Sequence, residues 1–346
     1  MEVSKTVLGG ALIGSALGVQ ISLMFAGPLL KRLGFQKTLF LGIPMLGVAE
    51  AAASMMHTPI AFFVLLAIGG LAIGAVEILV NLEADRTEHL VGRRIMNRAH
   101  AMWSFGFFTT GLIGAGAAQF GIHPAAQLLA ITVLCSLATF WLFAGFKPAP
   151  ARPHDSDSSS EFVWPTKGIL LIVAFCLSAM LLEGASADWS VIFMRDVFHT
   201  TPFLSGLALA FGALSQGILR FFADGLIDRF GTTLVARVLV ATLGVGVVTV
   251  TFATNPAMAL IGFALMGFGT SAIFPLAMSA AAQRTDRPAA ANVASLAQVA
   301  FTTFLLAPPL LGFIAEYFGI RVSFGLGIPL VILSWFTISS LQPPQK

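Results

Sequence analysis

The sequence has little charge and almost none of the residues that form crosslinks or bind metals. Charged residues make up 10% of its 346 residues, and it has only 2 cysteines and 1 tyrosine. A soluble domain carries about 25% charged residues, so this chain lacks the polar surface that a water-soluble fold needs. Cys135 and Cys176 both lie inside apolar runs, where we interpret them as small packing residues and not as a disulfide or a metal pair.

The sequence also lacks the motifs of ATP-driven and enzymatic membrane proteins. It contains no P-loop lysine motif, no His-Glu-x-x-His pair and no Gly-x-Ser-x-Gly turn. Gly267-Phe-Gly269 and Gly114-Ala-Gly116 are similar to glycine-rich nucleotide loops, but no strand precedes them and they lie in apolar segments. We therefore expect no enzyme activity, no cofactor and no bound metal.

Long apolar runs dominate the chain, which is 57% hydrophobic and contains 31 phenylalanines. Runs of about 20 residues, the length that crosses a hydrocarbon core of about 30 Å, recur with short breaks. The pattern predicts an all-α polytopic membrane protein without a cleaved signal peptide. The eleven spans that we expect lie at 6–26, 38–56, 60–83, 98–120, 124–146, 167–187, 202–222, 234–253, 257–281, 289–315 and 321–341.

The longest polar stretch, 147–166, is rich in Pro, Ser and acidic residues, as is typical of a flexible linker. It predicts two domains, an N-terminal bundle at 1–146 and a C-terminal bundle at 167–346. Lys and Arg concentrate in alternate loops, which the positive-inside rule assigns to the cytoplasm. We expect the C-terminus to be cytoplasmic and, with an odd number of spans, Met1 to lie outside.

The two predicted bundles are parallel repeats of one another. The segment 60–88 matches 258–286 at an offset of 198, and both end in Arg-Thr followed by an acid. Gly34 likewise matches Gly231 within a loop motif. Parallel repeats joined by a linker are typical of two-bundle secondary transporters. In this alignment the segment 6–26 corresponds to a second helix, so the sequence predicts that a first helix is missing, through a late start or a truncation.

The loop motif Ala-Asp-Gly-Leu-Ile-Asp-Arg-Phe-Gly at 223–231, followed by Arg237, resembles a signature of the major facilitator superfamily. The first half departs from it, with Lys31 at the position of the usual Asp. Other stretches look like bacterial inner-membrane permeases related to fucose permease: Glu77-Ile-Leu-Val-Asn81-Leu-Glu83, His100-Ala-Met-Trp-Ser-Phe-Gly106, Leu182-Glu183-Gly-Ala-Ser-Ala-Asp188-Trp189, Phe274-Pro275-Leu and Pro308-Pro309-Leu-Leu-Gly312. The resemblance implies the major facilitator fold, with six helices in each half, and proton-coupled transport that uses a membrane-embedded acid at Glu77.

Glu77 is a carboxylate inside an apolar span, where an acid is costly and is a functional-site hypothesis by default. Gly70, Gly74, Glu77 and Asn81 are spaced by 4, 3 and 4 residues and share one helix face, so we expect the acid to face protein or a water-filled cavity. The sequence predicts that Glu77 binds a proton or the solute with support from Asn81. The alternative is a glutamate that only hydrogen-bonds a neighbouring helix.

Three further polar residues lie in or beside expected spans. His100 is either part of a proton relay or an interfacial histidine beside Arg98. Gln20 and Gln216 fall one place apart in the repeat alignment, where paired amides suit a polar solute. Each amide could equally bond between helices.

Glu183 and Asp188 flank Gly184 at the expected outer end of span 167–187. Glycine and small residues there predict a broken helix end that lines the mouth of a cavity. We assign both acids to the solute site, with an outer loop cap as the alternative.

Four charged residues lie where the span 202–222 meets the cytoplasm: Arg220, Asp224, Asp228 and Arg229. We expect them to form a charge cluster that latches an inner gate and is remade during alternating access. A structural cap would explain them almost as well.

Together these patterns predict a secondary active transporter of a small solute in a bacterial inner membrane. Its expected partners are a small-molecule solute, by resemblance a sugar, together with protons and the lipid bilayer. We expect no nucleic-acid partner and a monomer. A drug or metabolite exporter, a non-transporting sensor and an inactive fragment remain alternatives.

Overall fold

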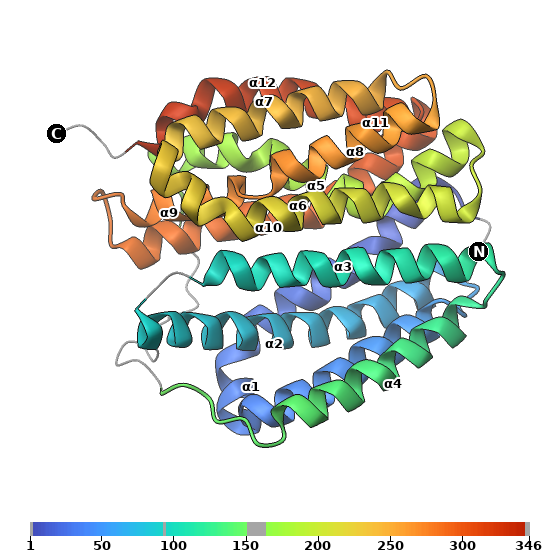
Figure 1. The fold of residues 1–346 in the computed structure, drawn as a ribbon, viewed down its shortest axis with the longest axis horizontal. Coiled ribbons are helices and arrows are strands. Elements are labelled where there is room, and N and C mark those ends of the chain that lie inside the picture. The colour runs from blue at the N-terminus through green and yellow to red at the C-terminus, as the bar shows by residue number, and fades with distance from the viewer. Residues whose placement is uncertain (1–2, 93–94, 151–163, 343–346) are drawn as a thin grey trace. The chain divides into compact units, whose positions relative to one another are not determined.

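The computed structural model describes residues 3–92, 95–150 and 164–342, apart from the side chains of residues 26–31 and 290. All regular elements in these ranges are helices (Figure 1), which confirms the expected all-α class. They are α1 (Lys5–Ala53), α2 (Pro59–Val91), α3 (Met96–Gln119), α4 (Pro124–Phe143), α5 (Lys167–Phe198), α6 (Pro202–Phe230), α7 (Thr232–Thr251), α8 (Pro256–Thr270), α9 (Ile273–Ala282), α10 (Ala289–Tyr317), α11 (Ile320–Gly325), α12 (Gly327–Thr337) and the 3₁₀ turn η1 (Ile338–Leu341).

The described ranges contain 9 candidate spans, helical segments long and apolar enough to cross a membrane, so the chain is a multi-pass membrane protein. Two of the expected spans, 38–56 and 98–120, are not apolar enough to count among these candidates. The second half of α1 carries Lys37 and Glu50, and α3 carries polar residues that include Asn97, Arg98 and His100. The division into five and six spans stays a prediction.

The glycines that separate helices agree with the internal repeat. Gly34 and Gly231, which the repeat aligns, both have positive φ, at 69° and 80°. Phe-Gly-Ile occurs at 120–122 and again at 318–320, also at an offset of 198, and its glycines behave alike, since Gly121 has φ 68° and Gly319 has φ 89°. A side chain is disfavoured at positive φ, so glycine is required where the chain turns between helices.

One expectation concerns the kink at Gly34. The spans 6–26 and 38–56 were expected as separate helices, and α1 consists of two helical parts that meet at Gly34, whose backbone is non-helical. The break between the two parts occupies this one residue and not a loop.

Contacts divide the chain into two compact units: Met1–Met96 with Phe120–Ser160, and Asn97–Gln119 with Glu161–Lys346. Helices α1, α2 and α4 belong to the first unit, and α3 with α5 to α12 belong to the second. The expected boundary at 147–166 would place α3 in the first bundle. That division stays a prediction, and residues 151–163 of the linker lie outside the described chain.

In the first unit, α1 and α2 approach through small residues. A Cβ added to Gly18 would meet the carbonyl oxygen of Ala67, and one added to Gly70 would meet that of Ser15. Gly74 continues this contact one turn further along α2. The small-residue stripe predicted on this helix is confirmed as a packing surface.

In the second unit, α5 supplies much of the buried core, and it corrects a second expectation. The span predicted to end at 187 continues to Phe198 without a break, so Glu183 and Asp188 lie inside the helix. Small residues that indicated a helix end are instead packing positions. Ala185 is buried, and a Cβ added to Gly184 would lie 3.7 Å from the ring of Phe304.

The expected span 257–281 is interrupted, because α8 ends at Thr270 and α9 begins at Ile273. Pro275, four residues after Ser271, has no amide hydrogen. It cannot donate the helical hydrogen bond that the carbonyl of Ser271 would otherwise accept. The interruption therefore presents a free backbone acceptor inside the second unit.

Candidate functional site

An ion pair lies at the centre of the candidate site in the second unit. Glu183 on α5 accepts hydrogen bonds at Oε1 from two side chains of α6, Gln216 Nε2 at 2.9 Å and Arg220 Nη2 at 3.1 Å. Gln216 and Arg220 are four residues apart and therefore project from the same face of α6.

Helices α3 and α8 complete this arrangement with hydroxyl groups. Ser104 Oγ accepts from Arg220 Nη1 at 3.1 Å and lies 3.2 Å from Gln216 Oε1. Gln216 Nε2 also lies 3.3 Å from Thr270 Oγ1. Gly217 allows this approach, because a Cβ there would come within 3.1 Å of the Ser104 side chain.

The interrupted helix supplies the remaining partner of the arginine. Arg220 Nε donates to the carbonyl oxygen of Ser271 at 2.8 Å. This is the carbonyl that Pro275 leaves without a helical donor. The arginine thus fills the gap in the backbone hydrogen-bonding of one helix while it pairs with an acid on another.

We call Ser104, Glu183, Gln216, Arg220, Thr270 and Ser271 the polar cluster. Its two charges differ in accessibility, since the side chain of Arg220 is 11% exposed and that of Glu183 is 26% exposed. A buried cation must be paired and hydrogen-bonded, and Arg220 satisfies that need within the cluster. No described residue bonds to Glu183 Oε2, so this oxygen can accept from a further donor.

Two of the expected site residues lie near the polar cluster, but their side chains form no hydrogen bond with it. His100 is one turn before Ser104 on α3, and its carbonyl oxygen accepts a hydrogen bond from Ser104 Oγ at 3.3 Å. Asp188 follows Glu183 by five residues and therefore points about 140° away around α5.

The four residues expected to form a gate latch have different contacts in the structure. Arg220 pairs with Glu183, as described above. Asp224 accepts from Asn97 Nδ2 at 2.6 Å, which joins the start of α3 to the end of α6. The guanidinium of Arg229 lies 5.2 Å from the ring centroid of Phe230. Asp228 is exposed, and the gating role of Asp224, Asp228 and Arg229 stays a prediction.

Glu77, Asn81 and Gln20 lie in the first unit. The side chain of Glu77 is exposed, and those of Asn81 and Gln20 are half-buried. Within the described part of the chain, no residue forms a hydrogen bond or an ion pair with Glu77. Its role in proton or solute binding stays a prediction.

Sequence reasoning missed Thr270 and Ser271 as members of the site. The signal that could have found them is the pair of hydroxyl residues in an apolar run, followed four residues after Ser271 by Pro275. A proline in that position marks a free carbonyl, and a free carbonyl inside a span needs a donor.

Apolar helices that surround a paired acid and base beside an interrupted helix define a membrane protein with a polar site inside its spans. The model of the Major Facilitator Superfamily matches residues 1–303 and 171–346, which together cover the whole chain. The chain belongs to this superfamily. It is therefore a membrane transporter and not an enzyme.

Curated relatives cover most of the chain. It is 30% identical over 326 residues to the uncharacterized transporter y4wD of Sinorhizobium fredii, covering 93% of this chain and 85% of that one. It is 27% identical over 333 residues to an uncharacterized MFS-type transporter of Yersinia pestis, covering 94% and 84%. The membrane protein MosC of Rhizobium meliloti is 26% identical over 329 residues, covering 88% of this chain and 76% of MosC.

Solved structures of the superfamily share the fold. A mutant of the nucleoside transporter NupG matches with a TM-score of 0.71 and 15% identity, covering 97% of this chain and 94% of that one. The D-xylose-proton symporter matches at 0.70 with 13% identity, covering 96% and 89%. A variant of the E. coli fucose:proton symporter FucP matches at 0.60 with 16% identity, covering 99% and 98%. These matches confirm the expected major facilitator fold.

Proposed function

We propose that the chain is a secondary active transporter that moves a small polar solute of the sugar class across a bacterial inner membrane. It works by alternating access and is driven by protons. The observation that carries this proposal is the polar cluster, which places an ion pair, an amide and hydroxyl groups inside apolar helices. Because the chain belongs to a superfamily of transporters, solute binding explains a polar cluster among apolar helices better than helix packing alone does.

The chemistry of the polar cluster suits a solute with several hydroxyl groups. Glu183 Oε2 is an ionic acceptor without a described partner, and charge-assisted hydrogen bonds are about twice as strong as neutral ones. Gln216 and Ser104 add groups that both donate and accept. A sugar hydroxyl that donates to Glu183 would be bound without disturbing the pairing of Arg220 with Glu183 Oε1.

Glu77 is our candidate for the proton site. The charge of Glu183 is offset by Arg220, whereas no described cation offsets that of Glu77. A carboxylate in a membrane span without a cationic partner is most readily neutralised by a proton. The fucose:proton and D-xylose-proton symporters, which share the fold, are consistent with a proton as the driving ion.

The topology follows from the basic loops. We assign the end of α6 that carries Arg229 and the loop before α10 that carries Arg287 to the cytoplasm, together with the C-terminus. The contact between Asn97 and Asp224 would then lie at the inner end of α3 and α6, where it can hold an inner gate closed.

Uptake into proteoliposomes tests the proposal. The purified chain is reconstituted, a pH gradient with an acidic exterior is imposed, and accumulation of L-fucose, D-xylose and uridine is measured. We expect at least one of these solutes to accumulate and a protonophore to abolish its accumulation. Gradient-driven movement of ethidium with no movement of the three sugar-containing solutes would contradict the sugar assignment and favour an exporter.

A further inference from the structure

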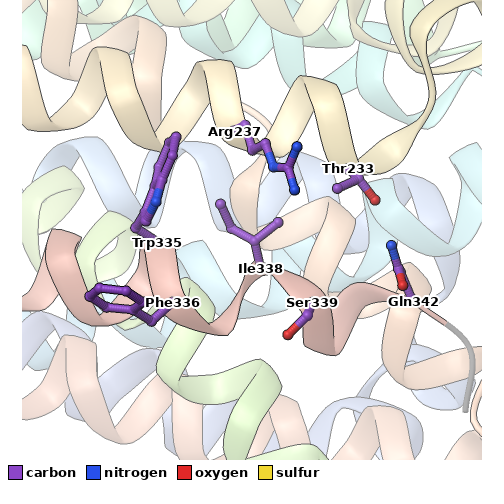
Figure 2. A pocket seen from close by; sticks show the side chains of 7 residues that line it. All are labelled: Thr233, Arg237, Trp335, Phe336, Ile338, Ser339 and Gln342. Carbon is purple, nitrogen blue, oxygen red and sulfur yellow. The ribbon is translucent and has the colours of Figure 1, made fainter.

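A pocket in the second unit lies between the start of α7 and the end of α12, away from the residues of the polar cluster. It has a volume of about 270 Å³ and is lined by Thr233, Arg237, Trp335, Phe336, Ile338, Ser339 and Gln342. Figure 2 shows the guanidinium of Arg237 extending along α7 toward Thr233, with the ring of Trp335 at the other end of the pocket.

The polar side chains of this pocket have no partners within the described chain. Arg237 is exposed, and no described acid pairs with it. Thr233 and Gln342 form no side-chain hydrogen bonds with described residues either. Helix α7 begins at Thr232 with no side-chain cap, so its first amide groups are also available, and a helix N-terminus favours anions. The pocket is thus lined by four kinds of hydrogen-bond donor: a guanidinium, a hydroxyl, a side-chain amide and backbone amides. No described acid accepts hydrogen bonds from them.

An apolar groove adjoins the pocket. It has a volume of about 370 Å³, and its lining is Val240, Ala241, Gly244, Val245, Val331, Ile332, Trp335 and Phe336. Trp335 and Phe336 line both spaces, so the groove and the pocket meet at these two side chains.

The groove is formed by the two helices that enclose the pocket. From Arg237 to Val245, α7 advances by eight residues, or about 12 Å. Gly244 lets α7 and α12 approach closely beside the groove, because a Cβ there would come within 3.1 Å of Val331 on α12. Both helices belong to segments that are candidate membrane spans, so we expect the groove to face the hydrocarbon of the bilayer.

We propose that this site binds an anionic phospholipid of the cytoplasmic leaflet. The phosphate of the headgroup lies against Arg237, Thr233 and the start of α7, and one acyl chain follows the apolar groove. The combination of a cationic end with an apolar continuation fits this occupant. A free phosphate would use only the pocket, and a zwitterionic lipid would gain less from the unpaired arginine.

Trp335 makes the site measurable, since brominated acyl chains quench the fluorescence of a tryptophan that they touch. The full chain is reconstituted in phosphatidylcholine vesicles that contain a small fraction of brominated phosphatidylglycerol or, in parallel, brominated phosphatidylcholine. The signal lost in Trp335→Phe gives the contribution of Trp335. We expect the brominated phosphatidylglycerol to quench it more strongly than brominated phosphatidylcholine does.

Matched variants separate the two parts of the site. Arg237→Gln should lower the apparent affinity for brominated phosphatidylglycerol about fivefold, as expected for one basic residue at an anionic surface. Arg237→Lys should retain most of the preference. Lys167→Gln, which removes an exposed positive charge at the start of α5, should leave it unchanged. Ala241→Phe, which fills the groove, should reduce quenching by both brominated lipids.

Two results would overturn the proposal. They are equal quenching of Trp335 by the two brominated lipids and an unchanged preference in Arg237→Gln. Equal quenching is the result expected of a pocket that takes a free phosphate and not a lipid. Thermal unfolding of each variant shows whether it is folded, and Ala241→Phe provides the test if Arg237→Gln is not.

Discussion

Arg220 shows how a long side chain can have its partners on helices other than its own. Its spacing from Asp224 and Asp228 on α6 predicted a charge cluster at the membrane surface. In the structure its guanidinium reaches Glu183 on α5 and the carbonyl of Ser271. Spacing along one helix reveals neighbours on that helix, whereas these two partners come from other helices of the second unit.

The pairing of Arg220 with Glu183 leads to a prediction about stability. Glu183→Gln leaves the arginine without its counterion in an apolar interior. Removing one partner of a fully buried pair costs about 3–5 kcal/mol, and partial exposure of Glu183 should reduce this to about 1–3 kcal/mol. Thermal unfolding of the purified chain measures the loss.

A double-mutant cycle supplies the control. Glu183→Gln combined with Arg220→Gln should cost less than the sum of the two single changes, because neither residue is then left as an unpaired charge. Arg195→Gln, which disrupts an exposed pair with Asp196, should cost less than about 1 kcal/mol. Strict additivity of the changes at 183 and 220 would show that the two side chains do not interact.

At the scale of elements, the interruption between α8 and α9 is built by one proline. The sequence places Pro275 inside the expected span 257–281, but it does not indicate which group would use the freed carbonyl. The group that uses the carbonyl is Arg220, and its position beside Ser271 is determined by the packing of α6 against α8. Gly267 permits this packing, since a Cβ there would meet the carbonyl oxygen of Gly212.

Pro275→Ala should therefore impair transport without unfolding the chain. Alanine restores an amide that can bond to the carbonyl of Ser271, in competition with Arg220. We expect slower solute uptake and an unfolding temperature that is unchanged or higher.

Pro256→Ala is the matched control for this prediction. Pro256 stands in the first turn of α8, where the amide has no helical acceptor, so its replacement should alter neither uptake nor the contacts of Arg220. Unchanged uptake in Pro275→Ala would contradict the importance of the interruption.

The loop between α9 and α10 is joined to the start of α5 by Asp286. Its carboxylate accepts from Arg284 Nη2 at 2.9 Å, from Asn292 Nδ2 at 3.0 Å and from Thr166 Oγ1 at 3.1 Å. The hydrogen bonds from Arg284 hold the pKa of this carboxyl well below its usual range, against the opposing effect of burial.

This shift predicts how stability depends on pH. Because the pKa of Asp286 is lower in the folded chain than the value of about 3.9 in an unfolded one, its contribution is present above about pH 4. The contribution declines as the pH falls below about 4 and is fully lost below the folded pKa, so a scan to pH 3 covers the first part of the decline. Unfolding temperatures measured from pH 6 to pH 3 should fall less steeply for Asp286→Asn than for the unchanged chain. Parallel curves would contradict this contribution, which surface exposure should limit to less than about 1 kcal/mol.

Helix α5 marks the limit of what local sequence could predict about an element. Gly184 and the small residues after it are equally compatible with a helix end and with a tightly packed helix. The buried side chains of Trp189 and Phe193 further along decide in favour of continuation. Their burial is a property of the second unit as a whole, so no local pattern could have shown it.

At the scale of the whole molecule, apolar spans and the internal repeat were enough to predict the fold. The paired glycines Gly34 with Gly231 and Gly121 with Gly319 share conformations as well as sequence positions. The polar cluster was predicted only in part, because Glu183 and Gln216 were named as candidates but their pairing with Arg220 was not. The internal repeat cannot predict the pairing of polar side chains, because the two halves differ at their polar positions. Glu77 in the first half, for example, aligns with Pro275 in the second.

The topology yields a prediction about accessibility. In a chain without native cysteines (Cys135→Ala, Cys176→Ala), Thr254→Cys lies between α7 and α8, and Arg287→Cys lies between α9 and α10. A maleimide that cannot cross membranes should label position 254 in intact cells and position 287 only after the cells are opened. The reverse pattern would invert the proposed orientation.

The central claim is that Glu183 binds the solute while Glu77 carries the proton. Proteoliposomes test it most directly when uptake driven by a pH gradient is compared with solute exchange at equal pH for Glu183→Gln, Glu77→Gln and the control Glu50→Gln. We predict that Glu183→Gln loses both activities, that Glu77→Gln loses gradient-driven uptake but retains exchange, and that Glu50→Gln retains both. Full retention of both activities in Glu183→Gln, or of gradient-driven uptake in Glu77→Gln, would contradict the account.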